Sequence, residues 1–372
     1  MSDSKPVRFA IIGCGSIASN GYQPRLLTYP KKVAIHGYFD KFPASAEKLN
    51  AAAGGKGKLY QSVEEVLADP DIEAILNTTT IEGHYAVSLA ALKAGKHVYS
   101  EKPIAITSPQ AAELLAEAKK RNLKIACAPS SALGYEQQDV WRRIRAGEIG
   151  TPHTVFGTFA CTRLEAWHAN ADVFMTNGTS VVADAAPYPL TCMTTFFGPI
   201  ARVYGSARII DPVRTLRTGP REGAKFTCTI PNMVIGILEF TNGMRGFINT
   251  GWSGRSETPP LEIHGTERAI TLNPHNDGAG IRTWSQYSSE ITPLPTPEKA
   301  MKNALDWGKG PVDLADAIRN NRPVRCSPAQ AAHIVEIAEA LNASSASGQA
   351  IALTTTFDPP APVGEVAPWE SA

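Results

Sequence analysis

The chain has 372 residues, too many for one ordinary hydrophobic core, so two domains are expected. Its 36 basic and 35 acidic residues nearly cancel and form no polybasic block, which argues against nucleic acid and anionic membranes as partners. No apolar stretch approaches the roughly 20 residues that span a bilayer, the first residues lack the apolar core of a signal peptide, and the 6 cysteines show no metal-binding spacing. We therefore expect a cytoplasmic protein with reduced cysteines and no metal site, acting on small molecules.

The first predicted element is a strand over residues 7–12, which stops at the hexamer GCGSIA, residues 13–18, where a helix begins. Gly13 supplies the positive φ of a tight turn, and Gly15 lets backbone N–H groups approach a pyrophosphate. Ala18 is small enough for the helix to pack on the strand. Because ordinary turns also produce such hexamers, the surrounding pattern decides the interpretation.

That pattern includes a second apolar run, residues 33–39, which ends at Asp40. A carboxylate at this point of a βαβ unit accepts hydrogen bonds from the ribose hydroxyls of a dinucleotide and repels a 2′-phosphate. The adjacent Lys41 is a cation that would tolerate the phosphate. The sequence therefore predicts a dinucleotide site that favours NAD, with NADP as the alternative.

Strand and helix signals continue to alternate as far as residue 128. Further strands are expected at 72–78, 97–101 and 124–128, and helices at 43–53, 63–68, 84–94 and 109–121. Ser62 and Glu65 form a capping box for the second of these helices. Because ligands of doubly wound parallel sheets lie at the carboxyl ends of the strands, the residues that follow the strands should face one crevice. These residues are Gly13, Asp40, Thr79 and Lys102.

From residue 129 the apolar residues alternate with period two, which indicates a mostly antiparallel sheet. Its strands are expected at 154–159, 202–209, 226–230, 233–240, 244–250, 261–265 and 269–272. Asn242-Gly243 predicts a hairpin, and helices are expected at 135–146 and from Ser327 onward. We therefore assign residues 1–128 to a dinucleotide-binding domain and 129–357 to an α+β domain with an open sheet. Residues 358–372 form a proline-rich tail, expected to be extended or disordered.

The order of these motifs resembles the Gfo/Idh/MocA family of oxidoreductases, named for glucose-fructose oxidoreductase and inositol dehydrogenase. The resemblance is carried by GCGSIA, Asp40, Thr79 with His84, AGKHVYSEKP at 94–103, RAGEIG at 145–150 and DAAPY at 184–188. It covers nearly the whole chain and implies a Rossmann domain followed by an open antiparallel sheet that carries substrate residues. It also implies NAD(P)-dependent chemistry on sugars, polyols and their derivatives. The chain departs from the family at residues 177–180, NGTS, and at Ala186, where glycines are usual.

Lys102, Asp184 and Tyr188 fall on the family's lysine, aspartate and His/Tyr positions, which implies that they are catalytic. Moving a hydride between a secondary alcohol and nicotinamide requires a proton acceptor, a cation that holds the oxygen and a carboxylate that positions the substrate. Tyr188 would be the acid/base, because an ammonium within about 4–6 Å lowers a tyrosine pKa. Lys102 would bridge the substrate and the nicotinamide ribose. The implied cofactor-binding residues are Gly13, Gly15, Ser16, Ile17, Asp40, Lys41, Thr79, His84, Glu101 and Lys102.

Residues 163–170, RLEAWHAN, precede Asp184 by the distance expected of a loop over an active site. Arg163, Trp167 and His168 are its substrate-binding candidates, because an indole stacks on a sugar ring and an imidazole forms hydrogen bonds to it. The alternative is a packed loop aromatic beside an exposed histidine.

Structural alternatives are also open for the catalytic candidates. Lys102 would then be a solvated strand-end lysine, Tyr188 a half-buried tyrosine and Asp184 a helix cap. His84 is expected to brace its helix near the cofactor and not to act in chemistry. Four further histidines are expected to be structural, namely His36, His97, His153 and His264.

The predicted function is an NAD(P)-dependent dehydrogenase of a sugar, polyol or sugar derivative. One alternative is a non-catalytic dinucleotide-binding sensor or scaffold, and another is a glycoside hydrolase on the same fold that retains its NAD. No predicted helix covers the second face of the open sheet, so we expect a homo-oligomer, a dimer or tetramer, to form through it.

Overall fold

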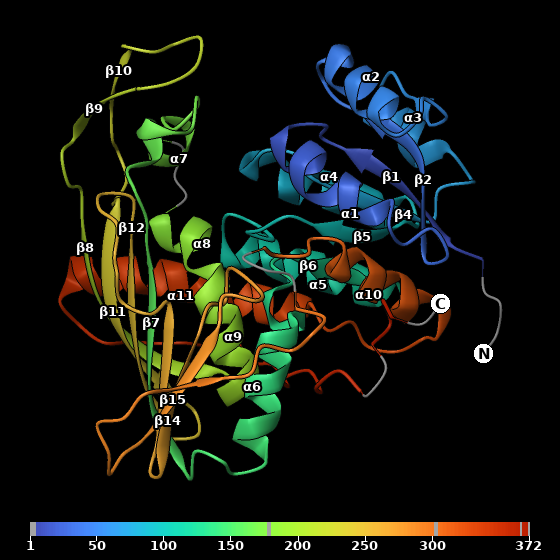
Figure 1. The fold of residues 1–372 in the computed structure, drawn as a ribbon. Coiled ribbons are helices and arrows are strands. Elements are labelled where there is room, and N and C mark those ends of the chain that lie inside the picture. Colours follow the sequence, from blue (N-terminus) through green and yellow to red (C-terminus); the bar gives the residue numbers. More distant parts are fainter. Residues whose placement is uncertain (1–4, 177–179, 301–303, 365–366, 371–372) are drawn as a thin grey trace. The chain divides into compact units, whose positions relative to one another are not determined.

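The protein, described here from a computed structural model, folds into two compact units (Figure 1). The structure describes residues 5–176, 180–300, 304–364 and 367–370. The first unit contains Met1–Leu133, Asp306–Ala332 and Pro360–Ala372, and the second contains Gly134–Leu305 and His333–Pro359. Residues 306–332, which we expected in the second domain, thus belong to the first unit. No helix among the described residues combines the length and the apolar character needed to cross a membrane.

The first unit is built on a six-stranded parallel sheet in the order β3-β2-β1-β4-β5-β6. The strands are β1 (Val7–Ile12), β2 (Val33–Phe39), β3 (Lys58–Leu59), β4 (Ala74–Asn77), β5 (His97–Ser100) and β6 (Ile125–Cys127). The strand order reverses between β1 and β4, which is the switch point where doubly wound sheets bind ligands. This order confirms the predicted Rossmann-type α/β fold.

Helices cover this sheet, and the four that the sequence predicts with bounds end within one residue of the predicted ends, whereas the helix at Lys309–Arg319 was not predicted. They are α1 (Gln23–Leu26), α2 (Pro43–Ala52), α3 (Val63–Ala68), α4 (Ile81–Lys93), α5 (Ser108–Lys120) and α10 (Lys309–Arg319), with a 3-10 turn, η2 (Ser131–Leu133). Ser62 caps α3 by accepting the Glu65 N–H at 3.1 Å, but the Glu65 carboxylate accepts the N–H of Gln61 and not that of Ser62. Helix α4 begins three residues before the predicted start.

The helix after the glycine turn is irregular. It opens as a π-helix, η1 (Ala18–Tyr22), and continues as the four-residue α1, in which Pro24 occupies the first turn. Proline has no N–H to donate, so the regular i to i−4 pattern cannot run through this point. The sequence predicts the start of a helix here but does not reveal its π geometry.

The second unit contains a nine-stranded sheet in the order β16-β15-β14-β13-β7-β12-β11-β8-β17, in which only the pairing of β12 with β7 is parallel among the described strands. Its strands are β7 (Pro152–Ala160), β8 (Ile200–Arg208), β11 (Met233–Phe240), β12 (Arg245–Gly251), β13 (Leu261–Gly265), β14 (Arg268–Leu272), β15 (Ile281–Ser285), β16 (Thr292–Leu294) and β17 (Ile351–Ala352). This arrangement confirms the mostly antiparallel sheet. The predicted strand at 226–230 instead forms a separate ribbon, in which β9 (Val213–Thr215) pairs with β10 (Lys225–Thr227).

Helices cover one face of the large sheet. They are α6 (Tyr135–Arg145), α7 (Val173–Thr176), α8 (Val181–Ala185), α9 (Pro187–Phe197) and α11 (Pro328–Ser347), with a 3-10 turn, η3 (Leu164–Ala166). Figure 1 shows α11 lying across the strands, and a Cβ built on Gly205 of β8 would meet the Leu341 carbonyl at 2.1 Å. Only glycine permits this close approach of helix and strand.

The tail is irregular and is anchored at several points. Residues 358–364 form no helix or strand, but Val363, Ala367 and Trp369 are buried in the first unit. The Lys309 ammonium lies 5.3 Å from the centre of the Trp369 ring, a cation–π distance. Apolar side chains spaced along the tail anchor it, and its proline content does not reveal this.

Candidate active site

The glycine turn has the geometry that a dinucleotide site requires. Gly13 has a φ of +94°, and a Cβ on it would lie 2.5 Å from the Thr78 carbonyl oxygen, because the ends of β1 and β4 meet here. A Cβ on Gly15 would meet no described atom within 4 Å, so the backbone there is open to a ligand. Ala18 is fully buried beneath the turn. Within the first unit, these residues fit a bound pyrophosphate.

Asp40 is held in place beside this turn. Its Oδ2 accepts the Cys14 N–H at 2.7 Å, and its Oδ1 accepts the Phe42 N–H at 2.8 Å. Lys41 does not pair with Asp40, since its ammonium lies 5.2 Å from the centre of the Phe42 ring. Burial, with a smaller contribution from Asp40, raises the pKa of Cys14 to about 12, so this thiol stays protonated and unreactive. The fixed carboxylate is suited to accept ribose hydroxyls.

His84 links the ends of two neighbouring strands. Its Nδ1 lies 2.8 Å from the Pro103 carbonyl oxygen, and its Nε2 lies 3.1 Å from that of Thr79. Burial lowers the pKa of His84, against the opposing effects of the Pro103 carbonyl and the Glu101 carboxylate. The ring thus links the loops after β4 and β5.

Lys102 is the second residue after β5. Its backbone N–H donates to Glu101 Oε2 at 2.9 Å, and Glu101 itself is only 7% exposed. Gly13 and Asp40 follow β1 and β2 of the same parallel sheet, so all three lie at its carboxyl edge. The first unit therefore brings its predicted residues to one edge.

In the second unit, Asp184 lies on α8 and Tyr188 in the first turn of α9. The alternative, that Asp184 caps the helix that follows it, is not what the structure shows, because the N-cap of α9 is Ala186 and no side chain caps it. The Tyr188 ring stacks on Phe159 of β7, with ring centres 5.4 Å apart and planes at 14°. The adjacent residues 177–179, part of the departure from the family pattern, lie outside the described part of the chain.

Three residues that sequence reasoning missed surround this pair. The His275 ring lies 4.4 Å from that of Tyr188 at 88°, and Phe159 packs against both. Burial, followed by the Asp184 carboxylate, raises the pKa of Cys161 to about 11. A histidine in a loop after a predicted strand is a weak sequence signal, because only the packing of the loop reveals what it faces.

Hydrogen bonds to the start of α6 fix the loop that carries His275. The Asp277 carboxylate accepts the N–H groups of Tyr135 and Glu136 at 3.0 Å, and the buried Glu136 accepts those of Ala279 and Gly280 at the same distance. These bonds tie the loop between β14 and β15 to the start of α6. These hydrogen bonds therefore hold the His275 ring against the Tyr188 ring.

The three candidate residues of the loop at 163–170 lie in different surroundings. The Arg163 guanidinium pairs with Asp211 and lies 3.6 Å from Glu165, so its charge is already balanced. Trp167 is 59% exposed. Burial lowers the pKa of His168, against the opposing effect of Asp184, which places this imidazole near the Asp184 carboxylate. His168 also packs between the rings of Trp167 and Phe174.

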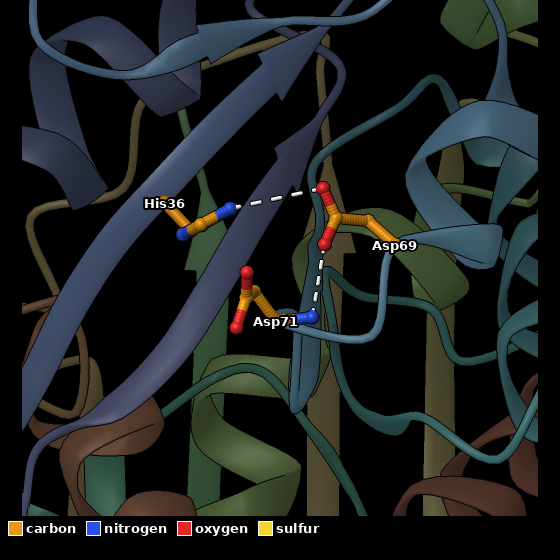
Figure 2. Close-up of side chains that lie close together, drawn as sticks. All are labelled: His36, Asp69 and Asp71. Carbon is orange, nitrogen blue, oxygen red and sulfur yellow. Dashed lines mark hydrogen bonds and ion pairs between the residues drawn. The ribbon is translucent and has the colours of Figure 1, made fainter.

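One group of side chains in the described residues has the spacing of metal ligands. His36, Asp69 and Asp71 offer ligand atoms within 4.8 Å of one another (Figure 2). However, Asp69 Oδ2 already accepts hydrogen bonds from the Lys58 ammonium and from the Tyr60 hydroxyl, each at 2.8 Å. A lysine that neutralises the central carboxylate opposes a second cation, and the group is therefore an ion-pair network.

The other predicted structural histidines have partners. His97 Nδ1 accepts the Lys124 N–H at 2.9 Å, and His264 Nε2 lies 2.7 Å from the Glu262 carboxylate. His153 Nδ1 lies 2.9 Å from the Thr154 hydroxyl.

Two family models match this sequence. Residues 7–128 match the oxidoreductase family with an NAD-binding Rossmann fold, and residues 138–271 match the GFO/IDH/MocA C-terminal domain. The two ranges correspond to the bulk of the parallel and the antiparallel sheets.

Individual proteins are similar over parts of the chain. The inositol 2-dehydrogenase/D-chiro-inositol 3-dehydrogenase of Lactiplantibacillus plantarum is 30% identical over 41% of this chain and 43% of its own length. The levoglucosan dehydrogenase of Pseudarthrobacter phenanthrenivorans is 25% identical over 56% of this chain and 57% of its own length. The chain thus matches less than two thirds of either relative. A solved apo levoglucosan dehydrogenase superposes with a TM-score of 0.82 at 19% identity, covering 95% of this chain and 100% of the other, so the two share a fold.

Proposed function

The chain belongs to the GFO/IDH/MocA family of oxidoreductases, whose first domain binds NAD, and from this premise we propose that it is an NAD(P)-dependent dehydrogenase. Its substrate would be a secondary alcohol, or the corresponding carbonyl, of a sugar, polyol or sugar derivative. The observation that carries the proposal is that Gly13, Asp40 and Lys102 all follow strands at the carboxyl edge of the NAD-binding sheet. The activities for which the two similar dehydrogenases are named support the substrate class.

The nicotinamide ring, when bound, supplies the hydride acceptor or donor. In the proposed mechanism the Lys102 ammonium holds the substrate oxygen and stabilises the negative charge that develops there. Tyr188 takes the hydroxyl proton, and Asp184 accepts hydrogen bonds that orient the substrate. Phe159 and His275 keep the Tyr188 ring in one orientation, since one lies parallel to it and the other perpendicular.

Asp40 supports a preference for NAD. Both of its oxygens are fixed by backbone N–H groups, and the Lys41 ammonium lies over Phe42 instead of pairing with the carboxylate. A fixed carboxylate attracts ribose hydroxyls and repels a 2′-phosphate. We propose that His168 and Trp167 contact the substrate. Arg163 is proposed to bind it more weakly, because its guanidinium already pairs with Asp211.

The test is a panel of aldoses, polyols and anhydrosugars offered with NAD⁺ and with NADP⁺, following the absorbance of the reduced nicotinamide. Turnover that is lost in Lys102→Ala supports the proposal. Binding of NADH without turnover of any member would indicate a sensor or scaffold. Cleavage of a glycoside without net NADH would indicate the NAD-retaining hydrolase.

A further inference from the structure

Tyr22 makes a contact that the proposed mechanism does not use. It is the last residue of η1, it is fully buried, and its hydroxyl donates to Glu101 Oε1 at 2.6 Å. The two residues are 79 positions apart in the sequence, so the bond joins the helix after the glycine turn to the end of β5. A hydrogen bond to a buried carboxylate is among the stronger kinds in proteins.

The other oxygen of the same carboxylate continues this connection. Glu101 Oε2 accepts the backbone N–H of Lys102 at 2.9 Å. A single carboxylate thus bridges a phenol on one element and the amide of the proposed catalytic lysine on another. If the phenol is removed, the carboxylate loses one of its donors and is free to turn away from the Lys102 amide.

We propose that Tyr22 is a positioning residue for Lys102, acting through the Glu101 carboxylate. This role rests on the proposed function of Lys102. It predicts that the Tyr22 hydroxyl matters for turnover although it touches neither substrate nor cofactor, and that its effect passes entirely through Glu101. A purely structural tyrosine would instead contribute only to stability.

Tyr38 provides a control. It is also a buried tyrosine of the first unit, and it lies on β2, which does not pair with β5. Tyr22→Phe and Tyr38→Phe therefore both remove a phenol oxygen from a buried ring, and only the first removes a donor to Glu101.

The decisive measurement is hydrogen exchange at single-residue resolution, which requires no substrate. In Tyr22→Phe the Lys102 amide should exchange about tenfold faster, since the hydrogen bond that protects it is weakened. The Val98 amide, which donates to the Lys124 carbonyl at 3.0 Å, should exchange at an unchanged rate and report that β5 is intact. Tyr38→Phe should leave the Lys102 amide unchanged. Unaltered Lys102 exchange in Tyr22→Phe, or equal acceleration in both variants, would overturn the inference.

Kinetics supply the second measurement. With the best substrate of the panel, Tyr22→Phe should lower kcat by about tenfold and leave the NADH Kd within about twofold. Adding Tyr22→Phe to Glu101→Gln should cause no further loss, because both act on one connection. An additional tenfold loss in the double variant would contradict the route through Glu101. If no substrate is found, only the proposed function fails, because the exchange result stands independently.

Should Tyr22→Phe fail to fold, Glu101→Gln alone tests the same connection. Its Lys102 amide should exchange faster while the Val98 amide does not. Unchanged exchange at Lys102 in this variant would equally reject the bridge.

Discussion

At the scale of single residues, Tyr188 carries the sharpest test of the chemistry. Tyr188→Phe keeps the ring that packs on Phe159 and His275 and removes only the hydroxyl. It should lower kcat by about 10²-fold or more and leave NAD binding almost normal, because proton transfer by a positioned group is commonly worth about 10² to 10⁴. Lys102→Ala should be at least as damaging. Steady-state kinetics, NAD titration and the thermal midpoint of each variant provide the measurement.

Tyr204→Phe is the control, because Tyr204 lies on β8 and is 39% exposed. Its kcat should match that of the unmodified protein. The wild-type kcat/KM for oxidation should rise with pH along an alkaline limb, since a phenolate is the proposed base. A near-normal kcat in Tyr188→Phe would remove the acid/base role.

Asp40 determines the expected choice of cofactor. The unmodified protein should use NAD with a higher kcat/KM than NADP, and Asp40→Ala should reduce this ratio by about tenfold or more, because the carboxylate no longer repels a 2′-phosphate. Lys41→Ala is the matched control. It should lower kcat/KM with NADP and leave kcat/KM with NAD unchanged. The assignment is wrong if NADP is the better cofactor and Asp40→Ala leaves the ratio as it was.

Asp69 tests the ion-pair interpretation of the network in Figure 2. Its hydrogen bonds, first from Lys58 and then from the Asp71 N–H, hold its pKa below the ordinary value, so the stability it contributes is present above about pH 4 and is lost as pH falls toward the folded-state pKa. Asp69→Asn should cost about 1–3 kcal/mol near neutral pH. Asp71→Asn should cost less, since Asp71 contributes its backbone N–H. Addition of EDTA should leave the thermal midpoint unchanged, whereas a lower midpoint would indicate a bound metal.

The sequence was most informative about residues that directly follow strands. Gly13, Asp40 and Lys102 could be placed together because parallel strands bring their carboxyl ends to one edge, whatever the details of packing. Tyr22 and His275 could not be placed, since their contacts depend on how distant segments pack. The bond from Tyr22 to Glu101 spans 79 residues, and no local pattern encodes it.

At the scale of elements, His333 links the α11 helix to the large sheet. Its Nε2 accepts the Ile200 N–H at 2.9 Å, so that nitrogen carries no proton, and its Nδ1 lies 2.7 Å from the Thr355 hydroxyl. Burial lowers the pKa of His333 to about 4, against the opposing effect of Glu336. Because an unfolded histidine titrates near about 6.5, the unfolded chain binds a proton between these values that the folded chain does not.

The stability contributed by neutral His333 is therefore full above about pH 6.5 and falls as pH drops toward about 4, by up to about 3 kcal/mol. The difference in Tm between the unmodified protein and His333→Asn should shrink as the pH is lowered from 7 to 5. If the Tm difference for His333→Asn does not change with pH, the folded protein does not favour the neutral form of this side chain.

Helices and strands with strong periodic signals were predicted well. Irregular elements, and those whose stability depends on neighbouring elements, were not. The alternation over 233–250 with Asn242-Gly243 predicted a hairpin, and β11 and β12 form it, with Gly243 at a φ of +91°. Helix α10 and the short strands β15 to β17 were missed. The short strands are stabilised by neighbours from elsewhere in the chain, and segments of two to five residues carry little periodicity. Helix α10 has a strongly amphipathic sequence, so its signal was present and was not used.

At the scale of the whole molecule, the open face of the large sheet provides the remaining prediction. Alternate side chains on this face are apolar and exposed, by 37% at Ile235, 49% at Ile237 and 40% at Phe156. Single exposed apolar residues are normal on a protein surface, but these side chains lie together on one face of a sheet. A symmetric pairing of two such sheets would bury them. We therefore propose a homo-oligomer, a dimer or tetramer, formed through this face.

Ile237→Glu should disrupt that assembly, because it places a charge at the centre of the apolar face and cannot be paired symmetrically. Light scattering at micromolar concentration should give a multiple of 39.8 kDa for the unmodified protein and a smaller mass for the variant. Val213→Glu is the control, since Val213 is 60% exposed on the separate β9–β10 ribbon, and it should leave the mass unchanged. A mass of one chain for the unmodified protein would exclude the assembly. An unchanged mass in Ile237→Glu would place the interface away from the open face, and equal dissociation by both variants would show that the effect is not specific to that face.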